Sequence, residues 1–182
     1  MNITLVSGTN RIGSQSLKVA QNLEKRYGAL GAKTTLLNLQ ELPLEIFSPE
    51  AYKKKPVSFR PFQDAVSNAD GLVVVVPEYN GSYPGVLKYF IDMLEFPSSF
   101  ENRPVAYIGI AAGMWGGLRS VEHLQGVFGY RNGFNFNERV FVPNVYKQIK
   151  EDGSFHSELI EQLIQQQTEH FLIYCDSLKS LR

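Results

Sequence analysis

Residues 71–76 read GLVVVV, an apolar run without the polar alternation that a half-exposed strand would show. Such a run is typical of a strand that is covered on both faces. Pro77 has no backbone N–H to donate to a neighbouring strand, so we expect the strand to end there. The run therefore predicts a central strand in a parallel sheet.

Apolar segments and helical patterns alternate on both sides of this run. We expect further strands at residues 2–7, 33–39, 104–111 and 138–144, and helices at residues 14–28, 59–69, 84–96, 116–129 and 157–181. Such alternation is typical of α/β proteins with a parallel sheet. It fits a flavodoxin-like three-layer sandwich, in which a five-stranded parallel sheet of order 2-1-3-4-5 has helices on both faces. We expect residues 1–182 to form one such domain.

The charge balance argues against several classes of partner. The chain has 182 residues, with 18 Lys and Arg against 18 Asp and Glu, so its formal net charge is zero. A neutral chain has no general electrostatic attraction to nucleic acid or to an anionic membrane. Cys175 stands alone, and His123, His156 and His170 are scattered, so we expect no disulfide and no metal site. We find no signal-peptide pattern and no apolar run long enough to span a bilayer, so we expect a soluble cytoplasmic protein.

Ligands of open parallel sheets bind at the carboxyl ends of the strands, where the strand order reverses. In the predicted order this place lies between the first and third strands. The loop after the first strand, SGTNRIGSQS (7–16), has two glycines at the spacing of a P-loop. Ser14 and Gln15 stand where the lysine and the Ser/Thr of a P-loop would bind a triphosphate and its metal. The loop therefore does not predict nucleoside triphosphate chemistry.

A terminal monophosphate suits this loop better. Thr9, Ser14 and Ser16 supply hydroxyl groups, and the following helix directs backbone N–H groups and a partial positive charge at the loop. Arg11 adds a full charge that can bind two phosphate oxygens at once. The alternative is that Ser14 only caps the helix and that Arg11 is a solvated surface residue.

The loop after the third strand, PEYNGSYPG (77–85), is rich in residues that shape the backbone. Two prolines stiffen it, while Gly81 and Gly85 permit sharp turns or close approach to a ligand. Tyr79 and the Asn80 amide offer an aromatic wall and polar groups along the edge of a flat ligand. The alternative is an ordinary tight connection that faces water. Glu78 has no obvious acid or base partner, so we assign it no catalytic role.

The loop after the fourth strand, AAGMWGGLRS (111–120), has three glycines and leads into a helix. Its N–H groups are placed to stabilise negative charge on a carbonyl-bearing ring. Trp115 either covers a planar ligand, lies in a subunit interface or is a partly buried core residue. A phosphate-binding loop, a flat rim and an anion-stabilising loop together indicate flavin mononucleotide (FMN).

Three stretches, SGTNRIGS, PEYNGSYPGVLKYFID and AAGMWGG, resemble the NAD(P)H-dependent FMN reductase family, which includes related quinone and azo reductases. The resemblance implies that a first group of residues binds the FMN phosphate: Thr9, Arg11, Ser14, Gln15 and Ser16. It implies that a second group lines the isoalloxazine ring: Pro77, Glu78, Tyr79, Asn80, Gly81 and Ser82. It implies that a third group lies at the pyrimidine edge of the ring: Gly113, Met114, Trp115, Gly116 and Gly117.

The same resemblance implies an oxidoreductase. Hydride passes from NADPH or NADH through bound FMN to a small acceptor, which is a quinone, free flavin, an azo compound or a metal ion. No side chain is required as a catalyst, because the cofactor performs the chemistry. The family also implies a homodimer or homotetramer, with residues 84–96 as a candidate interface. Two alternatives stay open: a non-enzymatic FMN-binding electron carrier or redox sensor, and a nucleotide-binding module without flavin.

Overall fold

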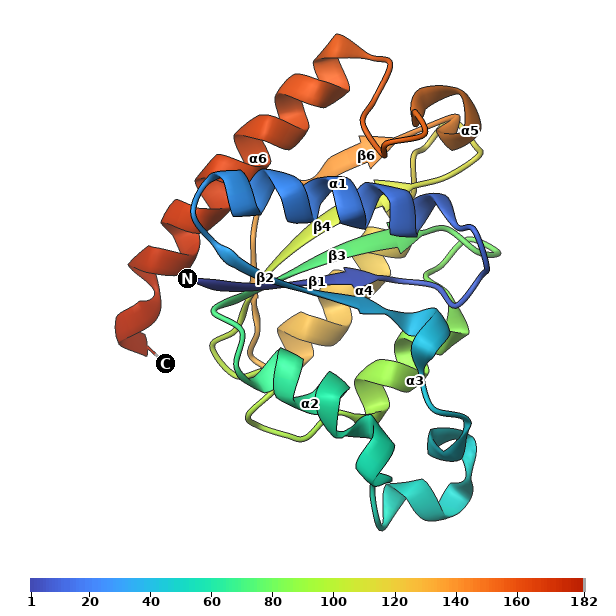
Figure 1. Cartoon of the computed structure of the whole chain (residues 1–182), viewed down its shortest axis with the longest axis vertical. Coiled ribbons are helices and arrows are strands. Elements are labelled where there is room, and N and C mark those ends of the chain that lie inside the picture. Colours follow the sequence, from blue (N-terminus) through green and yellow to red (C-terminus); the bar gives the residue numbers. More distant parts are fainter. Residues whose placement is uncertain (182) are drawn as a thin grey trace.

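The computed structural model describes residues 1–181 and contains one six-stranded sheet (Figure 1). The strands are β1 (Asn2–Ser7), β2 (Lys33–Asn38), β3 (Gly71–Pro77), β4 (Pro104–Ile110), β5 (Phe134–Asn135) and β6 (Val140–Val142). The helices are α1 (Gln15–Ala29), α2 (Arg60–Ser67), α3 (Gly85–Met93), α4 (Leu118–Tyr130), α5 (Val145–Gln148) and α6 (Glu158–Ser177). Short 3-10 turns lie at Leu39–Glu41, Leu44–Phe47, Pro49–Tyr52, Val57–Phe59 and Lys179–Leu181.

The strand order is β2-β1-β3-β4-β5, with β6 also paired to β4, and every pairing is parallel. This confirms the flavodoxin-like topology predicted from the sequence. The run at 71–76 forms the greater part of β3, and all seven residues of that strand are buried. Burial on both faces explains why the run lacks polar alternation.

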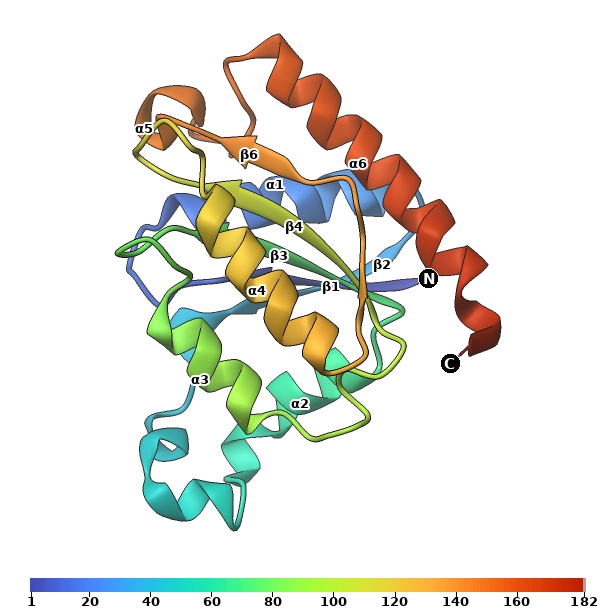
Figure 2. The same ribbon diagram turned by 180° about the vertical axis from the view of Figure 1, so that it is seen from behind.

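The sheet separates two apolar cores, because successive strand side chains point to opposite faces. Val74 and Val76 of β3 pack in the core shared with α2, α3 and α4. Val73 and Val75 pack in the core shared with α1 and α6. Figures 1 and 2 show the two helical layers from opposite sides.

The predicted fifth strand at 138–144 differs in the structure. Only its middle part forms a strand, β6 (Val140–Val142), which pairs with β4 near the end of that strand. A second short strand, β5 (Phe134–Asn135), precedes the predicted range and pairs with the start of β4. Between them the buried side chain of Gln167 on α6 donates to the carbonyl oxygens of Tyr107 (3.0 Å) and Glu138 (2.7 Å). A helix side chain thus satisfies backbone groups where a continuous strand would have bonded, and the pairing is interrupted there.

Within residues 1–181, no helix is both long and apolar enough to cross a membrane. The same residues contain no cluster of three or more His, Cys, Asp or Glu side chains that could hold a metal ion.

Helix α6 packs closely against the first residue of β3. A Cβ atom at Gly71 would lie 2.5 Å from Cys175 Sγ and 2.9 Å from the ring of Phe171. Real Cβ atoms do not come this close to neighbours, so the contact between α6 and β3 requires glycine at this position.

We predict that Gly71→Ala lowers the free energy of unfolding by about 1–3 kcal/mol, the usual cost of overpacking a core. The measurement is urea denaturation followed by circular dichroism. Cys175→Ala provides the control, because it removes the nearest obstructing atom. The double variant should lose less stability than the sum of the two single variants, and strict additivity would contradict this account.

Candidate functional site

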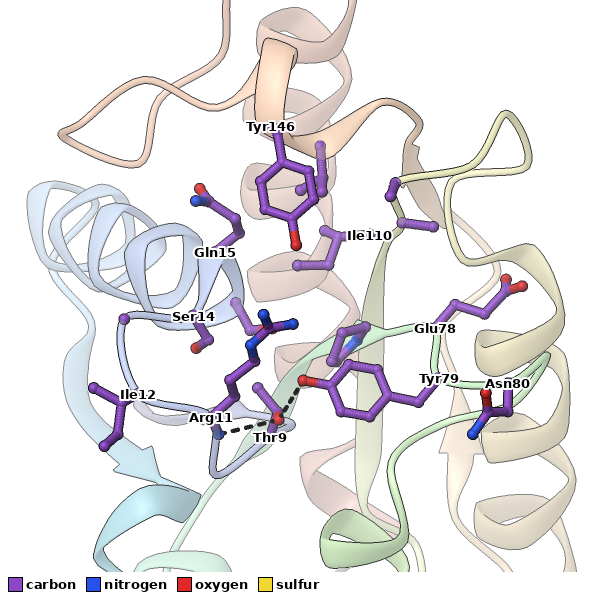
Figure 3. Close-up of a pocket in the computed structure, with 16 residues that line it drawn as sticks. Thr9, Arg11, Ile12, Ser14, Gln15, Glu78, Tyr79, Asn80, Ile110 and Tyr146 are labelled. Carbon is purple, nitrogen blue, oxygen red and sulfur yellow. Dashed lines mark hydrogen bonds between the residues drawn. The ribbon is translucent and has the colours of Figure 1, made fainter.

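A pocket of about 490 Å³ lies at the carboxyl end of the sheet. Its walls come from the loops after β1, β3 and β4 and from the short helix α5 (Figure 3). The volume is within the range of pockets that bind small molecules and cofactors. The place is the reversal of strand order between β1 and β3, where the sequence predicted a ligand.

One end of the pocket is the phosphate cradle, our name for Thr9, Arg11, Ser14, Gln15 and Ser16, all of which line it. Ser14 caps α1: its side-chain oxygen accepts from the N–H of Leu17 at 3.2 Å. The N–H groups of Gln15 and Ser16 have no hydrogen-bond partner within the described chain. No acidic residue occurs in the first turn of α1, so its partial positive charge is uncompensated. The cradle therefore favours an anion.

Arg11 adds the full positive charge at this end. Its side chain is exposed and forms no ion pair or hydrogen bond with residues 1–181. Figure 3 shows the guanidinium directed toward the middle of the pocket. A cation that lies in a pocket without a protein partner is available to a ligand, and guanidinium geometry suits phosphate oxygens.

The opposite wall begins with the rim turn, our name for residues 79–82. Tyr79 and Ser82 exchange two backbone hydrogen bonds, of 2.8 and 3.1 Å. Asn80 (φ 53°) and Gly81 (φ 79°) are both left-handed, as a two-residue type I′ turn requires. This explains the Asn-Gly pair in the sequence, because these residue types adopt positive φ most readily.

Two side-chain hydrogen bonds hold the rim turn in place. The Tyr79 hydroxyl lies 2.9 Å from Thr9 Oγ1, across the pocket in the phosphate cradle (Figure 3). Ser82 Oγ lies 2.9 Å from His123 Nδ1 on α4. The rim turn is thus fixed to the loop after β1 at one end and to a helix at the other.

Glu78 connects the rim turn to the sheet rather than to the phosphate cradle. Its N–H donates to the carbonyl of Ile110 at 3.0 Å, and its carboxylate points away from Arg11 in Figure 3. One carboxylate oxygen is buried without a hydrogen-bond partner among the described residues. Such a group is available to a hydrogen-bond donor from a ligand.

The structure brings nine of the sixteen residues predicted for the site into this pocket: Thr9, Arg11, Ser14, Gln15, Ser16, Pro77, Glu78, Tyr79 and Asn80. Gly81 and Ser82 complete the rim turn but do not line the pocket. Gly113, Met114, Trp115, Gly116 and Gly117 also lie outside its lining, which at this wall consists of Ile110, Ala111 and Ala112. Their predicted roles toward the ring stay predictions.

The loop after β4 divides into a buried part and an exposed part. Gly116 and Gly117 are buried, and a Cβ at Gly117 would lie 2.7 Å from the backbone nitrogen of Ile110. Met114 and Trp115 are 74% and 64% exposed. In this chain Trp115 is therefore not a core residue, which leaves the flavin and a subunit interface as its candidate contacts.

Sequence reasoning missed the wall formed by α5. Val145 and Tyr146 line the pocket, and Figure 3 shows the Tyr146 hydroxyl directed into it. The N–H of Val145 donates to the carbonyl of Ala111 at 3.0 Å, which fixes α5 beside the loop after β4. The available signal was position: α5 directly follows β6, at the same edge of the sheet as the other loops. Ile12 was also missed, although it belongs to the loop after β1.

A flavodoxin-like sheet with an anion-binding end and a shaped rim in one pocket defines an α/β protein that binds a phosphorylated planar cofactor. The model of one family, NADPH-dependent FMN reductase, matches residues 1–147. The chain belongs to this family. The match confirms the resemblance noted in the sequence, the oxidoreductase class, and FMN and NAD(P)H as the cofactors.

Individual relatives agree with the family. A 2-hydroxy-1,4-benzoquinone reductase from a Burkholderia species is 33% identical over 119 residues, which cover 63% of this chain and 65% of the relative, just under two thirds of its length. An NAD(P)H-dependent FMN reductase of Pseudomonas aeruginosa is 27% identical over 180 residues, covering 96% and 95% of the two chains. The fold matches that of a flavoenzyme NAD(P)H:(acceptor) oxidoreductase from Paracoccus denitrificans, with a TM-score of 0.82, 21% identity and 97% coverage of each chain.

The residues present fit FMN. The phosphate cradle supplies what a phosphate ester needs: N–H groups without partners, hydroxyl groups and one unpaired guanidinium. The rim turn and Tyr146 supply backbone polar groups and aromatic surface at the other walls. Among the described residues that line the pocket, Glu78 is the only acidic one.

We predict that Arg11→Ala weakens FMN binding by about 1.5–3 kcal/mol, the range for hydrogen bonds to charged groups. Arg11→Lys keeps the charge but loses the two-point geometry, so it should recover only part of the loss. The measurement is titration by flavin fluorescence, with riboflavin as the control ligand, because it lacks the phosphate. An unchanged affinity for FMN would place Arg11 outside the site.

Proposed function

We propose that this chain is an FMN-dependent oxidoreductase that passes hydride from NAD(P)H to a quinone. The observation that carries the proposal is the joining of the phosphate cradle and the rim turn in one pocket, with Arg11 unpaired at the cradle end. Bound FMN supplies the redox chemistry, since it accepts and donates hydride equivalents. The chain supplies binding, orientation and electrostatics.

Each wall has a separate task in this proposal. The N–H groups of Gln15 and Ser16, with Arg11, hold the phosphate. The rim turn supports the edge of the ring system, because its own hydrogen bonds fix its shape before a ligand arrives. The loop at 113–117 lies at the same sheet edge, and its backbone N–H groups are proposed to stabilise negative charge at the pyrimidine edge.

Quinones suit the apolar surface of this pocket. Ile12, Tyr79 and Tyr146 line it with exposed apolar or aromatic side chains, and Met114 and Trp115 lie exposed on the loop after β4. Uncharged planar acceptors match such surface, whereas anionic metal chelates gain little from it. Curated relatives of the chain include several quinone reductases.

Three broader properties accompany the proposal. We propose that residues 1–182 form one FMN-binding domain and that the protein acts in the cytoplasm, where its single buried thiol stays reduced. We also propose a homodimer or homotetramer that uses the α3 region. Phe96, in the loop after α3, and Tyr130, at the end of α4, are 55% and 82% exposed. The Arg131 guanidinium lies over both rings, so they belong to one surface that a second copy could cover.

The test of the proposed function is a spectrum of the FMN-reconstituted protein. Anaerobic NADPH should bleach the bound flavin, and 1,4-benzoquinone should restore its colour. Steady NADPH consumption should follow when both are in excess, and it should be faster with the quinone than with free FMN, an azo dye or a ferric chelate. Flavin that binds but is not reduced would favour an electron carrier, and a protein that never binds FMN would contradict the proposal.

We predict that Asn80→Gly changes flavin affinity or the flavin potential more than it changes stability, because glycine preserves the left-handed backbone and removes only the amide. Asn80→Ala is the matched comparison: it also removes the amide but adds backbone strain, so it should lower stability further. The measurements are flavin titration, potentiometry and thermal unfolding. If Asn80→Gly leaves both the flavin potential and the flavin affinity unchanged, the Asn80 amide does not contact the flavin.

A further inference from the structure

The hydrogen bond between Thr9 and Tyr79 joins two parts of the pocket that are 70 residues apart in sequence. Thr9 is 1% exposed and belongs to the phosphate cradle, while Tyr79 begins the rim turn. The bond is 2.9 Å long, and either hydroxyl can be its donor. It therefore links the phosphate-binding end of the pocket to its ring-binding side directly (Figure 3).

The hydroxyl groups of Thr9 and Tyr79 have one hydrogen that their mutual bond does not use. Thr9 Oγ1 accepts the backbone N–H of Arg11 at 3.3 Å and shares one hydroxyl hydrogen with Tyr79. Two hydroxyls carry two hydrogens, and the mutual bond uses one of them. The second has no acceptor among residues 1–181, and both side chains line the pocket. An anion in the pocket can accept it.

A hydroxyl that donates its hydrogen to an anion becomes a stronger acceptor for the other hydroxyl of the pair. The hydrogen bond between the two hydroxyls is therefore strengthened, because hydrogen bonds in a chain polarise one another. A phosphate at the cradle would thus tighten the contact between Thr9 and Tyr79. Tyr79 cannot shift independently of the rim turn, since its N–H and C=O are both bonded to Ser82. Phosphate binding would therefore steady the surface that meets the flavin ring.

We propose that Tyr79 is a positioning residue that acts through Thr9, so that phosphate binding and ring binding reinforce each other. The inference rests on the proposed function, because it takes FMN as the occupant of the pocket. It adds a reason for the enzyme to prefer FMN to riboflavin beyond the direct attraction of phosphate to Arg11.

The experiment is a double-mutant cycle read by flavin titration. The variants are Tyr79→Phe, Thr9→Val and the two combined, each titrated with FMN and with riboflavin by flavin fluorescence. Tyr174→Phe is the matched control, because it removes the hydroxyl of a tyrosine on α6 that does not line the pocket. Thr9→Ser keeps the hydroxyl and tests for rescue if the buried valine impairs folding.

In the wild-type background, Tyr79→Phe should weaken FMN binding about 3- to 10-fold, as expected for one neutral hydrogen bond. The same change should weaken riboflavin binding less than about twofold, and it should have little further effect on FMN once Thr9→Val is present. Thr9→Ser should retain most of the FMN affinity, and Tyr174→Phe should retain all of it.

Two outcomes would overturn the inference while leaving the proposed function intact. If Tyr79→Phe weakens FMN and riboflavin equally, its hydroxyl contacts the ring itself. If its effect on FMN is the same with Thr9 and with Val at this position, the two residues are not coupled. A wild-type protein that fails to bind FMN in the same titration would instead contradict the proposed function.

Discussion

Parallel pairing of β1 with β3 is the constraint on which the rest of the site depends. Ser7 pairs with Val75, and the next residue, Gly8, donates its N–H to the carbonyl of Val75 at 3.0 Å. In a parallel pair the two strands end at the same edge, so the loops that follow them must meet. The phosphate cradle and the rim turn face each other for this reason, although 70 residues separate Thr9 from Tyr79.

Different parts of this site contribute charge, shape and aromatic surface. Charge is concentrated at the α1 end, where Arg11 and the free N–H groups of the helix lie. The rim turn contributes shape, and α5 contributes an aromatic wall through Tyr146. In a flavin-dependent family the cofactor carries out the reaction, so these residues are assigned binding and positioning roles.

The sequence revealed the parts of the fold that follow from local patterns. The apolar run of β3 and the strand-helix alternation are properties of neighbouring residues, and they predicted the strand order. The set of site residues came from the family resemblance together with the loop compositions, and nine of them line the pocket. The wall that contains Tyr146 depends on tertiary contacts. It exists because α5 is held beside the loop after β4, where the N–H of Val145 donates to the carbonyl of Ala111.

The loop after β4 illustrates the same limit. Its glycines indicate that the backbone of this loop lies close to another group, but the local sequence does not identify that group. In the structure Gly117 is packed against the backbone at Ile110, so the neighbour is the sheet rather than the pocket. Met114 and Trp115 are left exposed beside it, where a glycine-rich pattern alone could not place them.

The rim turn holds its shape without help from a ligand, through its reciprocal backbone bonds and its left-handed Asn-Gly pair. The conformational entropy of these residues is therefore lost when the protein folds and not when a ligand binds. A rigid receptor of this kind gives up little freedom when its ligand arrives, so a larger share of the contact energy appears as affinity. Such preorganisation raises the affinity for a ligand without adding contacts.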